Sequence, residues 1–199
     1  MGHLSFTFGT MGAGKTAAAL ALKEDLEAMG TTVWLMRPAA DTRGETGMVS
    51  SRNGCSSPAL TIRADFDLFS MFRHRLKDAA VIVDEAQFLL AYQVEALRRL
   101  ADEADVRIHC FGIRTDFSGH LFPGAQRLLE LADGVSVIRS RCECGSDAVI
   151  NARIGEDGLP ETGGSVYEIG DMGRYRPLCH RCWETSAASK SVQPARPRR

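Results

Sequence analysis

Short apolar runs alternate along the chain with stretches whose apolar residues recur at helical spacing. Strands are predicted for the runs rich in β-branched, aromatic or uninterrupted apolar residues, which are 3–8, 31–36, 59–63, 80–83, 106–112 and 135–138. Helices are predicted where apolar residues return every three or four positions, at 16–29, 67–77, 92–104 and 126–132. This alternation is typical of an α/β domain in which helices flank a mostly parallel sheet.

Two stretches fit neither pattern. Residues 38–58 are polar, rich in Gly, Ser, Thr and Arg, and are predicted to form a long loop. Long loops in compact domains are usually functional or mobile. Residues 186–199 consist mainly of Ser, Ala, Pro and Arg and are predicted to form a disordered basic tail.

The first predicted strand leads into a glycine-rich segment, and a predicted helix follows it. The segment consists of Gly9, Thr10, Met11, Gly12, Ala13, Gly14, Lys15 and Thr16. Its pattern of glycine, four residues, then glycine, lysine and threonine is that of a phosphate-binding loop. The glycines let backbone N–H groups converge on phosphates, Lys15 adds a positive charge, and the Thr16 hydroxyl can bind Mg²⁺. The segment therefore predicts a site for a nucleoside triphosphate, strengthened by the positive end of the helix dipole.

Two acids, Asp84 and Glu85, follow the apolar run 80–83. Parallel strands end at one edge of the sheet, so the pair is expected beside the phosphate-binding loop. Successive residues of a straight strand point to opposite faces, which predicts separate roles. Asp84 is predicted to hold Mg²⁺, and Glu85 to accept a proton from the attacking oxygen. A solvated acid pair is the alternative, and the pair alone does not separate a kinase from an ATPase.

Four of the six cysteines form two close pairs, Cys142 with Cys144 and Cys179 with Cys182. The second pair has the two-residue spacing by which thiolates chelate zinc, whereas only one residue separates the first pair. The absence of a secretory signal pattern favours a reducing compartment, and so zinc over disulfides. We predict zinc on all four cysteines, with a site that uses His180 or a site without metal as the alternatives.

Residues 84–88, Asp-Glu-Ala-Gln-Phe, resemble the Asp-Glu-x-Gln-Phe signature of the cellular-type (type II) thymidine kinases. Other segments of that family appear in the same order: the phosphate-binding loop with a Met inside, Asp-Thr-Arg at 41–43, Thr-Asp-Phe-Ser-Gly at 115–119 with Phe122, and the paired cysteines with Tyr175 between them. The resemblance covers most of the chain, from residue 4 to residue 183. The close spacing of the first cysteine pair departs from the usual pair of the family.

This resemblance implies a deoxythymidine kinase of nucleotide salvage, which transfers the γ-phosphate of ATP to the 5′-hydroxyl of deoxythymidine. It implies ATP, Mg²⁺ and structural Zn²⁺ as cofactors, Glu85 as the catalytic base, and a homotetramer inhibited by dTTP. A lasso-like loop between the cysteine pairs is implied to hold the base through main-chain groups.

The resemblance also implies the residues of the nucleoside pocket, which are Met11, Gln87, Phe88, Ile113, Phe117, Phe122, Val166 and Tyr175. Apolar residues of this kind more often belong to a core, so it is their match to family positions that favours the pocket. Asp41 and Arg43 are expected in the phosphate and metal network. Arg114 is a further candidate to share the charge of the transition state.

Length and composition limit the remaining possibilities. At 199 residues and 44% hydrophobic content, the chain can form one main domain with a small appendage. The predicted division is a nucleotide-binding kinase domain at 1–139, a zinc-binding lobe with a substrate-covering loop at 140–185, and the tail at 186–199. No apolar run approaches the ~18 residues that cross a bilayer, so a cytoplasmic protein without a membrane partner is expected. The formal net charge of −1 argues against a nucleic-acid partner.

Two other classes of function stay open at this point. One is a phosphate-loop ATPase that couples hydrolysis to a macromolecular partner, and it predicts ATP turnover without a nucleoside. The other is a zinc-ribbon binding module with a vestigial nucleotide site, which predicts nucleic-acid binding that weakens steeply with salt.

Overall fold

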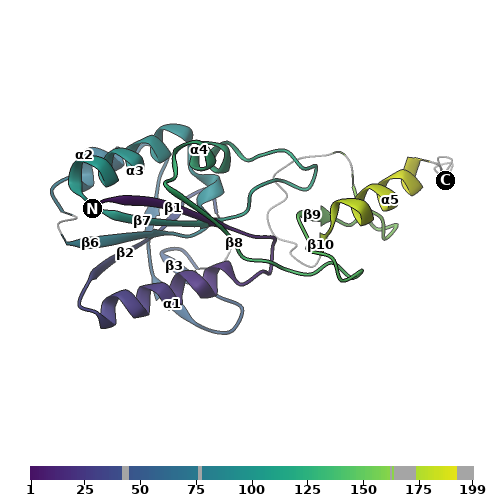
Figure 1. Cartoon of the computed structure of the whole chain (residues 1–199), viewed down its shortest axis with the longest axis horizontal. Helices are drawn as coiled ribbons and strands as arrows, with labels where there is room; N and C mark the ends of the chain where they lie inside the picture. Colours follow the sequence, from purple (N-terminus) through teal and green to yellow (C-terminus); the bar gives the residue numbers. More distant parts are fainter. Residues whose placement is uncertain (42–44, 76–77, 162, 164–173, 192–199) are drawn as a thin grey trace.

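The structure is a computed structural model that describes residues 1–41, 45–75, 78–161, 163 and 174–191, without the side chains of 188–191. Its main body is a six-stranded sheet in the order β5-β2-β6-β7-β1-β8, and all neighbours in it run parallel (Figure 1). The strands are β1 (His3–Phe8), β2 (Thr32–Pro38), β5 (Leu60–Ile62), β6 (Ala79–Val83), β7 (Arg107–Gly112) and β8 (Gly134–Val137). This confirms the predicted parallel α/β architecture.

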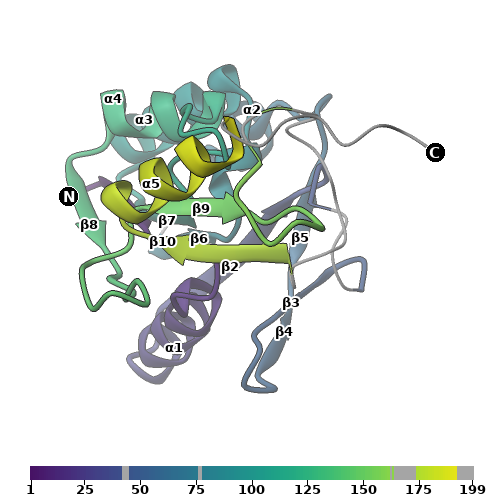
Figure 2. The same ribbon diagram turned by 90° about the vertical axis from the view of Figure 1, so that its right-hand side faces the viewer.

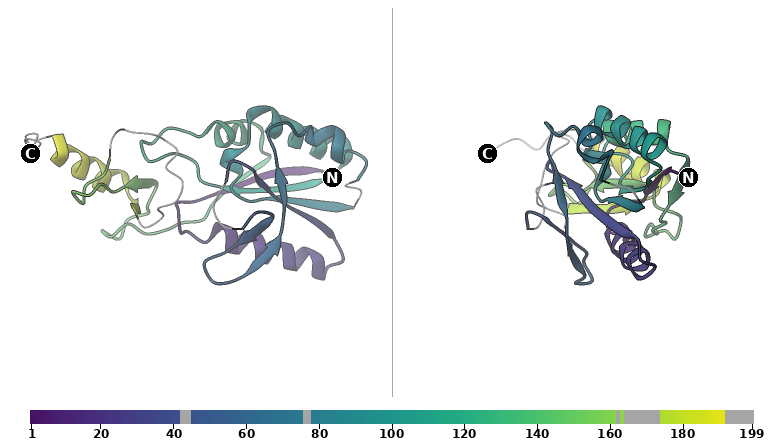
Figure 3. Two further views of the ribbon diagram at one scale, coloured as in Figure 1. Left: turned by 180° about the vertical axis from the view of Figure 1, so that it is seen from behind. Right: turned by 90° about the vertical axis from the view of Figure 1, so that its left-hand side faces the viewer.

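Helices cover both faces of this sheet (Figures 1 and 3). Helix α1 (Lys15–Ala28) lies on one face, and α2 (Leu68–Phe72), α3 (Ala91–Ala104) and α4 (Pro123–Leu131) lie on the other. Two cores result, because the strands between the two layers are apolar on both sides; all five residues of β6 are buried. Among the described helices, none is both long and apolar enough to span a bilayer.

Two local predictions differ from the structure. The stretch predicted as a loop contains a hairpin of β3 (Met48–Ser50) and β4 (Ser56–Pro58), whose three-residue strands are too short to show an alternating pattern. Helix α2 ends at Phe72, earlier than the predicted helix that extends to residue 77. Its core contacts through Leu68, Phe69 and Phe72 are complete by that point.

Beyond β8 the chain forms a small lobe that faces the viewer in Figure 2. It contains the antiparallel pair β9 (Ile150–Arg153) and β10 (Tyr175–Leu178), followed by α5 (His180–Ser191). Its core is small and includes two of the paired cysteines, Cys142 and Cys179. Helix α5 extends into the stretch from residue 186 that the composition predicts to be disordered.

Candidate active site

Residues 9–14 connect β1 to α1 and, with Lys15 and Thr16 at the start of α1, form the turn expected of a phosphate-binding loop. Gly14 precedes α1 with φ +91°, a left-handed conformation that side-chain-bearing residues seldom adopt. Lys15 is buried, and its ammonium donates to the carbonyl oxygen of Thr10 at 2.8 Å. The lysine charge is therefore held inside the loop, where the positive end of α1 adds to it.

Asp84 follows β6 and meets the phosphate-binding loop from the neighbouring part of the sheet. Its Oδ2 accepts a hydrogen bond from the Thr16 hydroxyl at 2.9 Å, while its buried Oδ1 has no hydrogen-bond partner among the described residues. Burial, and then the neighbouring charge of Glu85, raises the pKa of the Asp84 carboxyl to about 6. A buried carboxylate oxygen without a partner, next to a hydroxyl, fits the oxygen ligands that Mg²⁺ prefers.

We predict that Asp84→Asn stabilises the protein in magnesium-free buffer at pH 7.5. The folded-state pKa of about 6 lies above the ordinary 3.8, so stability from this carboxyl is full below pH 3.8 and is lost as the pH rises through about 6. The neutral amide would remove a cost of up to about 3 kcal/mol. Urea unfolding measures the gain, which should shrink at pH 5. A variant less stable than the wild type at pH 7.5 would contradict this explanation.

Glu85 leaves the sheet in a left-handed turn with φ +52°, where the prediction assumed a straight strand. Such a conformation costs a side-chain-bearing residue about 1–3 kcal/mol and is concentrated at functional sites. The turn redirects the chain directly after Asp84, and the charge of Glu85 raises the pKa of Asp84. In a straight strand the two adjacent acids would point to opposite faces of the sheet. The turn at Glu85 instead leaves its charge close enough to Asp84 to raise the pKa of that carboxyl.

Gln87 connects Glu85 to the end of β7. Its side-chain nitrogen donates to Glu85 Oε2 at 2.6 Å, and its side-chain oxygen accepts from the Ile113 backbone N–H at 3.0 Å. Gln87 is only 2% exposed. Its carboxamide thus orients the Glu85 carboxylate. A contact between Gln87 and the nucleoside remains a prediction.

The predicted apolar pocket residues gather around this edge of the sheet. Ile113 and Phe122 are buried in the core on the α3 face, and Met11 and Phe88 are half-buried against that core. The rings of Phe88 and Phe122 meet edge to face, with centroids 5.7 Å apart. Phe117 is buried as well.

Phe117 is covered by the small lobe. The guanidinium of Arg153, a buried residue of β9, stacks over its ring at 3.8 Å from the centroid. Tyr175, at the start of β10, pairs with Arg153 across the two strands. The nucleoside contacts predicted for Phe117 and Tyr175 remain predictions.

Asp41 and Arg114, two of the residues predicted for the phosphate network, contact other side chains of the protein. Asp41 forms an ion pair with Arg37 at 3.0 Å, and both side chains are largely buried. The guanidinium of Arg114 lies 5.4 Å from the centroid of the Phe8 ring. Arg43 and Val166 lie outside the described residues.

A set of contacts between the phosphate-binding loop and the chain around the small lobe was not predicted from the sequence. A Cβ on Gly9 would lie 2.5 Å from the Ile138 carbonyl oxygen, so only glycine permits this approach. The hydroxyls of Thr10 and Ser140 share a hydrogen bond. The Met11 backbone N–H donates to Asn151 Oδ1 at 2.6 Å, a bond of the loop itself to β9.

Asn151 is 4% exposed, and its side-chain nitrogen also donates to the Thr115 carbonyl oxygen at 3.4 Å. Its carboxamide therefore joins the lobe to both the phosphate-binding loop and the segment 115–119. The sequence holds one signal of these contacts. Asn151 is an amide next to apolar residues, and an amide that is buried in a strand needs hydrogen-bond partners.

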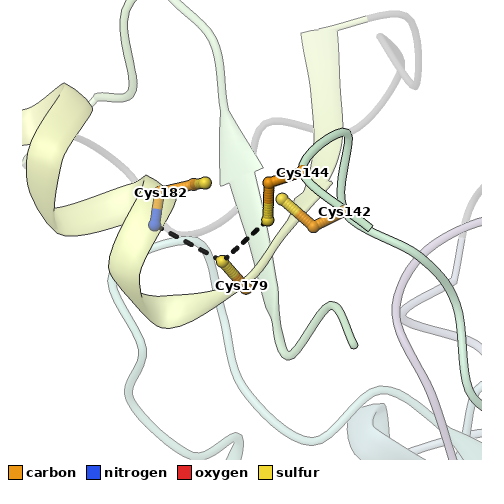
Figure 4. Close-up of side chains that lie close together, drawn as sticks. All are labelled: Cys142, Cys144, Cys179 and Cys182. Atoms are coloured by element: carbon orange, nitrogen blue, oxygen red, sulfur yellow. Dashed lines mark hydrogen bonds between the residues drawn. The ribbon is translucent and has the colours of Figure 1, made fainter. Parts of the chain in front are cut away.

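The four paired cysteines come together in the lobe, and their side chains point toward one another in Figure 4. Their sulfur atoms all lie within 4.8 Å of one another. Sulfurs around a tetrahedral zinc are about 3.8 Å apart, given zinc–sulfur bonds of about 2.3 Å. The cluster therefore fits a zinc ion.

The close spacing of Cys142 and Cys144 is accommodated by a tight turn. The Gly145 backbone N–H donates to the Cys142 carbonyl oxygen at 2.8 Å, and Cys142 N–H donates to the Ser146 carbonyl oxygen at 2.9 Å. His180, the alternative ligand, is 65% exposed and lies 3.5 Å from Glu184. Among the described residues, the group that could hold a metal consists of the four cysteines alone.

Comparison with known proteins adds independent information. The sequence model of a family described as "Thymidine kinase" matches residues 2–183. A thymidine kinase of Chromobacterium violaceum is 40% identical over 184 residues, which cover 92% of this chain and 98% of that protein. The thymidine kinase of Enterobacteria phage T4 is 39% identical over 186 residues, 92% of this chain and 96% of that protein. The similarity thus extends over nearly the full length of both relatives.

Proposed function

Because the chain belongs to the thymidine kinase family, we propose that it transfers the γ-phosphate of ATP to the 5′-hydroxyl of deoxythymidine. The observation that carries this proposal is the bond between Thr16 and Asp84, which joins the phosphate-binding loop to the strand end that also supplies Glu85. The loop proposed to bind ATP and the carboxylate proposed to accept the proton, Glu85, therefore lie at one edge of the sheet.

The chemistry assigned to these residues is an in-line displacement. The Glu85 carboxylate accepts the proton of the 5′-hydroxyl as its oxygen forms a bond to the γ-phosphorus. The bond from that phosphorus to the oxygen of ADP breaks, and ADP leaves with the electron pair. Gln87 fixes the orientation of the Glu85 carboxylate throughout.

The loop residues stabilise the charge that spreads over the transferring phosphoryl group. Lys15 and the backbone N–H groups of the loop supply fixed positive charge. Mg²⁺, held by Thr16 and Asp84, would neutralise phosphate oxygens when bound. Asp41 and Arg43 remain proposed members of this network.

The nucleoside is proposed to bind against the apolar residues Met11, Phe88, Ile113, Phe117 and Phe122, with Gln87, Val166 and Tyr175 as further contacts. Flat aromatic and thioether faces suit a pyrimidine ring. Structural zinc in a lobe at 140–185 is supported by the cysteine cluster. A homotetramer and inhibition by dTTP are proposed from family membership. A kinase domain at 1–139, a basic tail from 186, and a cytoplasmic location without nucleic-acid partners are proposed from the composition and order of the sequence.

An ADP-release assay with and without deoxythymidine tests the function. We expect ADP to form at least 100-fold faster with the nucleoside, because its 5′-hydroxyl is the acceptor. Equal rates in the two reactions would refute the kinase proposal and favour the alternative, an ATPase coupled to a macromolecular partner.

A further inference from the structure

An arginine that no sequence motif indicated lies directly against the phosphate-binding loop. A Cβ built on Gly12 would be 3.1 Å from Arg52 Nη1 and 3.8 Å from Arg52 Cζ. Both residues are exposed, so this contact lies at the open surface of the loop. The guanidinium is therefore within reach of anions that the loop binds.

The turn that carries Arg52 has a defined shape. It joins β3 to β4, and the Ser51 backbone N–H donates to the Cys55 carbonyl oxygen at 2.8 Å. The Gly54 N–H donates to the Ser51 carbonyl oxygen at 3.1 Å, and the Ser51 hydroxyl donates to Asn53. These bonds fix the direction in which the turn presents Arg52.

The hairpin is in turn fastened to the body. Val49 is 4% exposed and packs in the core on the α1 face, beside Ala19 and Leu20. Arg37, at the end of β2, donates to the Met48 carbonyl oxygen at 2.7 Å. The hairpin thus lies on the same side of the sheet as α1, in agreement with Figures 1 and 2.

A second cation beside the phosphate-binding loop would stabilise the reaction. Transfer of a γ-phosphoryl group spreads negative charge over several oxygens, and arginine binds phosphate through a planar pair of donors. Lys15 is buried inside the loop, where it donates to the Thr10 carbonyl oxygen. Arg52 approaches the same loop from its exposed surface.

We propose that Arg52 is a phosphate-binding residue of the active site, contacting the anionic oxygens of the ATP triphosphate from the β3–β4 turn. This inference rests on the proposed function for its substrate, ATP. It extends that function, because it gives the β3–β4 hairpin the task of completing the phosphate site.

The test compares Arg52→Ala and Arg52→Lys with two controls. Arg63→Ala removes an exposed arginine that pairs with Asp65, and Asn53→Ala loosens the same turn without changing charge. We expect Arg52→Ala to lower kcat/KM for ATP by roughly 10- to 100-fold. The KM for deoxythymidine should change by less than twofold. Arg52→Lys should recover part of the loss, and millimolar guanidinium should partly rescue the alanine variant.

ATP affinity is measured separately by equilibrium dialysis without a nucleoside, so the result does not depend on which acceptor the enzyme uses. We expect weaker ATP binding in Arg52→Ala than in Arg63→Ala, with equal urea midpoints. ATP affinity and kcat/KM within twofold of Arg63→Ala would overturn the inference. A wild-type protein that binds ATP but does not phosphorylate deoxythymidine would instead refute the proposed function alone.

Discussion

Replacing Glu85 by glutamine is expected to reduce kcat by about 10²- to 10⁴-fold, the usual contribution of a general base. The amide keeps the size of the side chain but cannot accept the proton of the 5′-hydroxyl. Gln87 holds the carboxylate at 2.6 Å, and a glutamine oxygen can accept the same hydrogen bond. ATP binding should therefore stay within threefold of the wild type. Steady-state kinetics with deoxythymidine and equilibrium dialysis with ATP measure the two effects.

The matched control is Glu24→Gln, the same chemical change on the exposed surface of α1. It should leave kcat unchanged. A Glu85→Gln enzyme with near-normal turnover would show that another group accepts the proton. Parallel losses of turnover and ATP binding would instead indicate that Glu85 supports the phosphate site and not the proton transfer.

The parts of this site that could be predicted are those with a fixed local spacing. The phosphate-binding loop is one, because its glycines, lysine and threonine must follow one another to surround an anion. The pair of Asp84 and Glu85 is another, because an apolar strand delivers both acids to the edge of the sheet. The parallel direction of the strands also follows from their alternation with helices.

The parts that could not be predicted depend on contacts between distant segments. Asn151 reaches Met11 across 140 positions of the chain, and although a buried amide must find partners, the sequence does not indicate which residue it meets. Arg52 lies in a stretch predicted to be a loop, and only the hairpin brings it to Gly12. The left-handed turn at Glu85 was missed because strand periodicity assumes an unbroken strand.

Loss of the cysteine cluster is expected to be the largest single change in stability. The lobe has a small core, and it contains two of the four cysteines. Structural zinc contributes about 10–16 kcal/mol to the folding of small zinc-finger peptides. We predict one zinc ion per wild-type chain, and clearly less than one in Cys182→Ser. Elemental analysis of the purified protein checks both values.

Neighbouring sulfurs explain why metal binding at the cluster should release protons. Hydrogen bonds from Ser146 lower the pKa of the Cys144 thiol to about 6, whereas Cys179, Cys144 and Cys142 raise that of Cys182 to about 12. Without metal, four thiolates could not coexist at neutral pH, because their charges repel. Zinc should therefore displace protons when it binds, and a weakly buffered solution should become more acidic on its addition.

The variant should also be less stable to heat. Loss of even about 3 kcal/mol corresponds to a fall of roughly 6–12 °C in Tm for a chain of this size. Cys55→Ser is the matched control, since Cys55 is exposed in the β3–β4 turn, outside the cluster. A Cys182→Ser protein with full zinc and an unchanged Tm would contradict the assignment of this cysteine as a ligand.

The lobe and the nucleotide site should influence each other through the contacts of residues 9–11 with Ile138, Ser140 and Asn151. Cys182→Ser is therefore expected to raise the KM for ATP, although Cys182 lies outside the phosphate site. Coupling between two binding sites is reciprocal in binding free energy, so ATP should tighten the equilibrium binding of zinc by about fivefold or more. Competition with a coloured zinc indicator at equilibrium measures that affinity. Equal zinc affinities with and without ATP would show that these contacts support the loop without transmitting the state of the lobe.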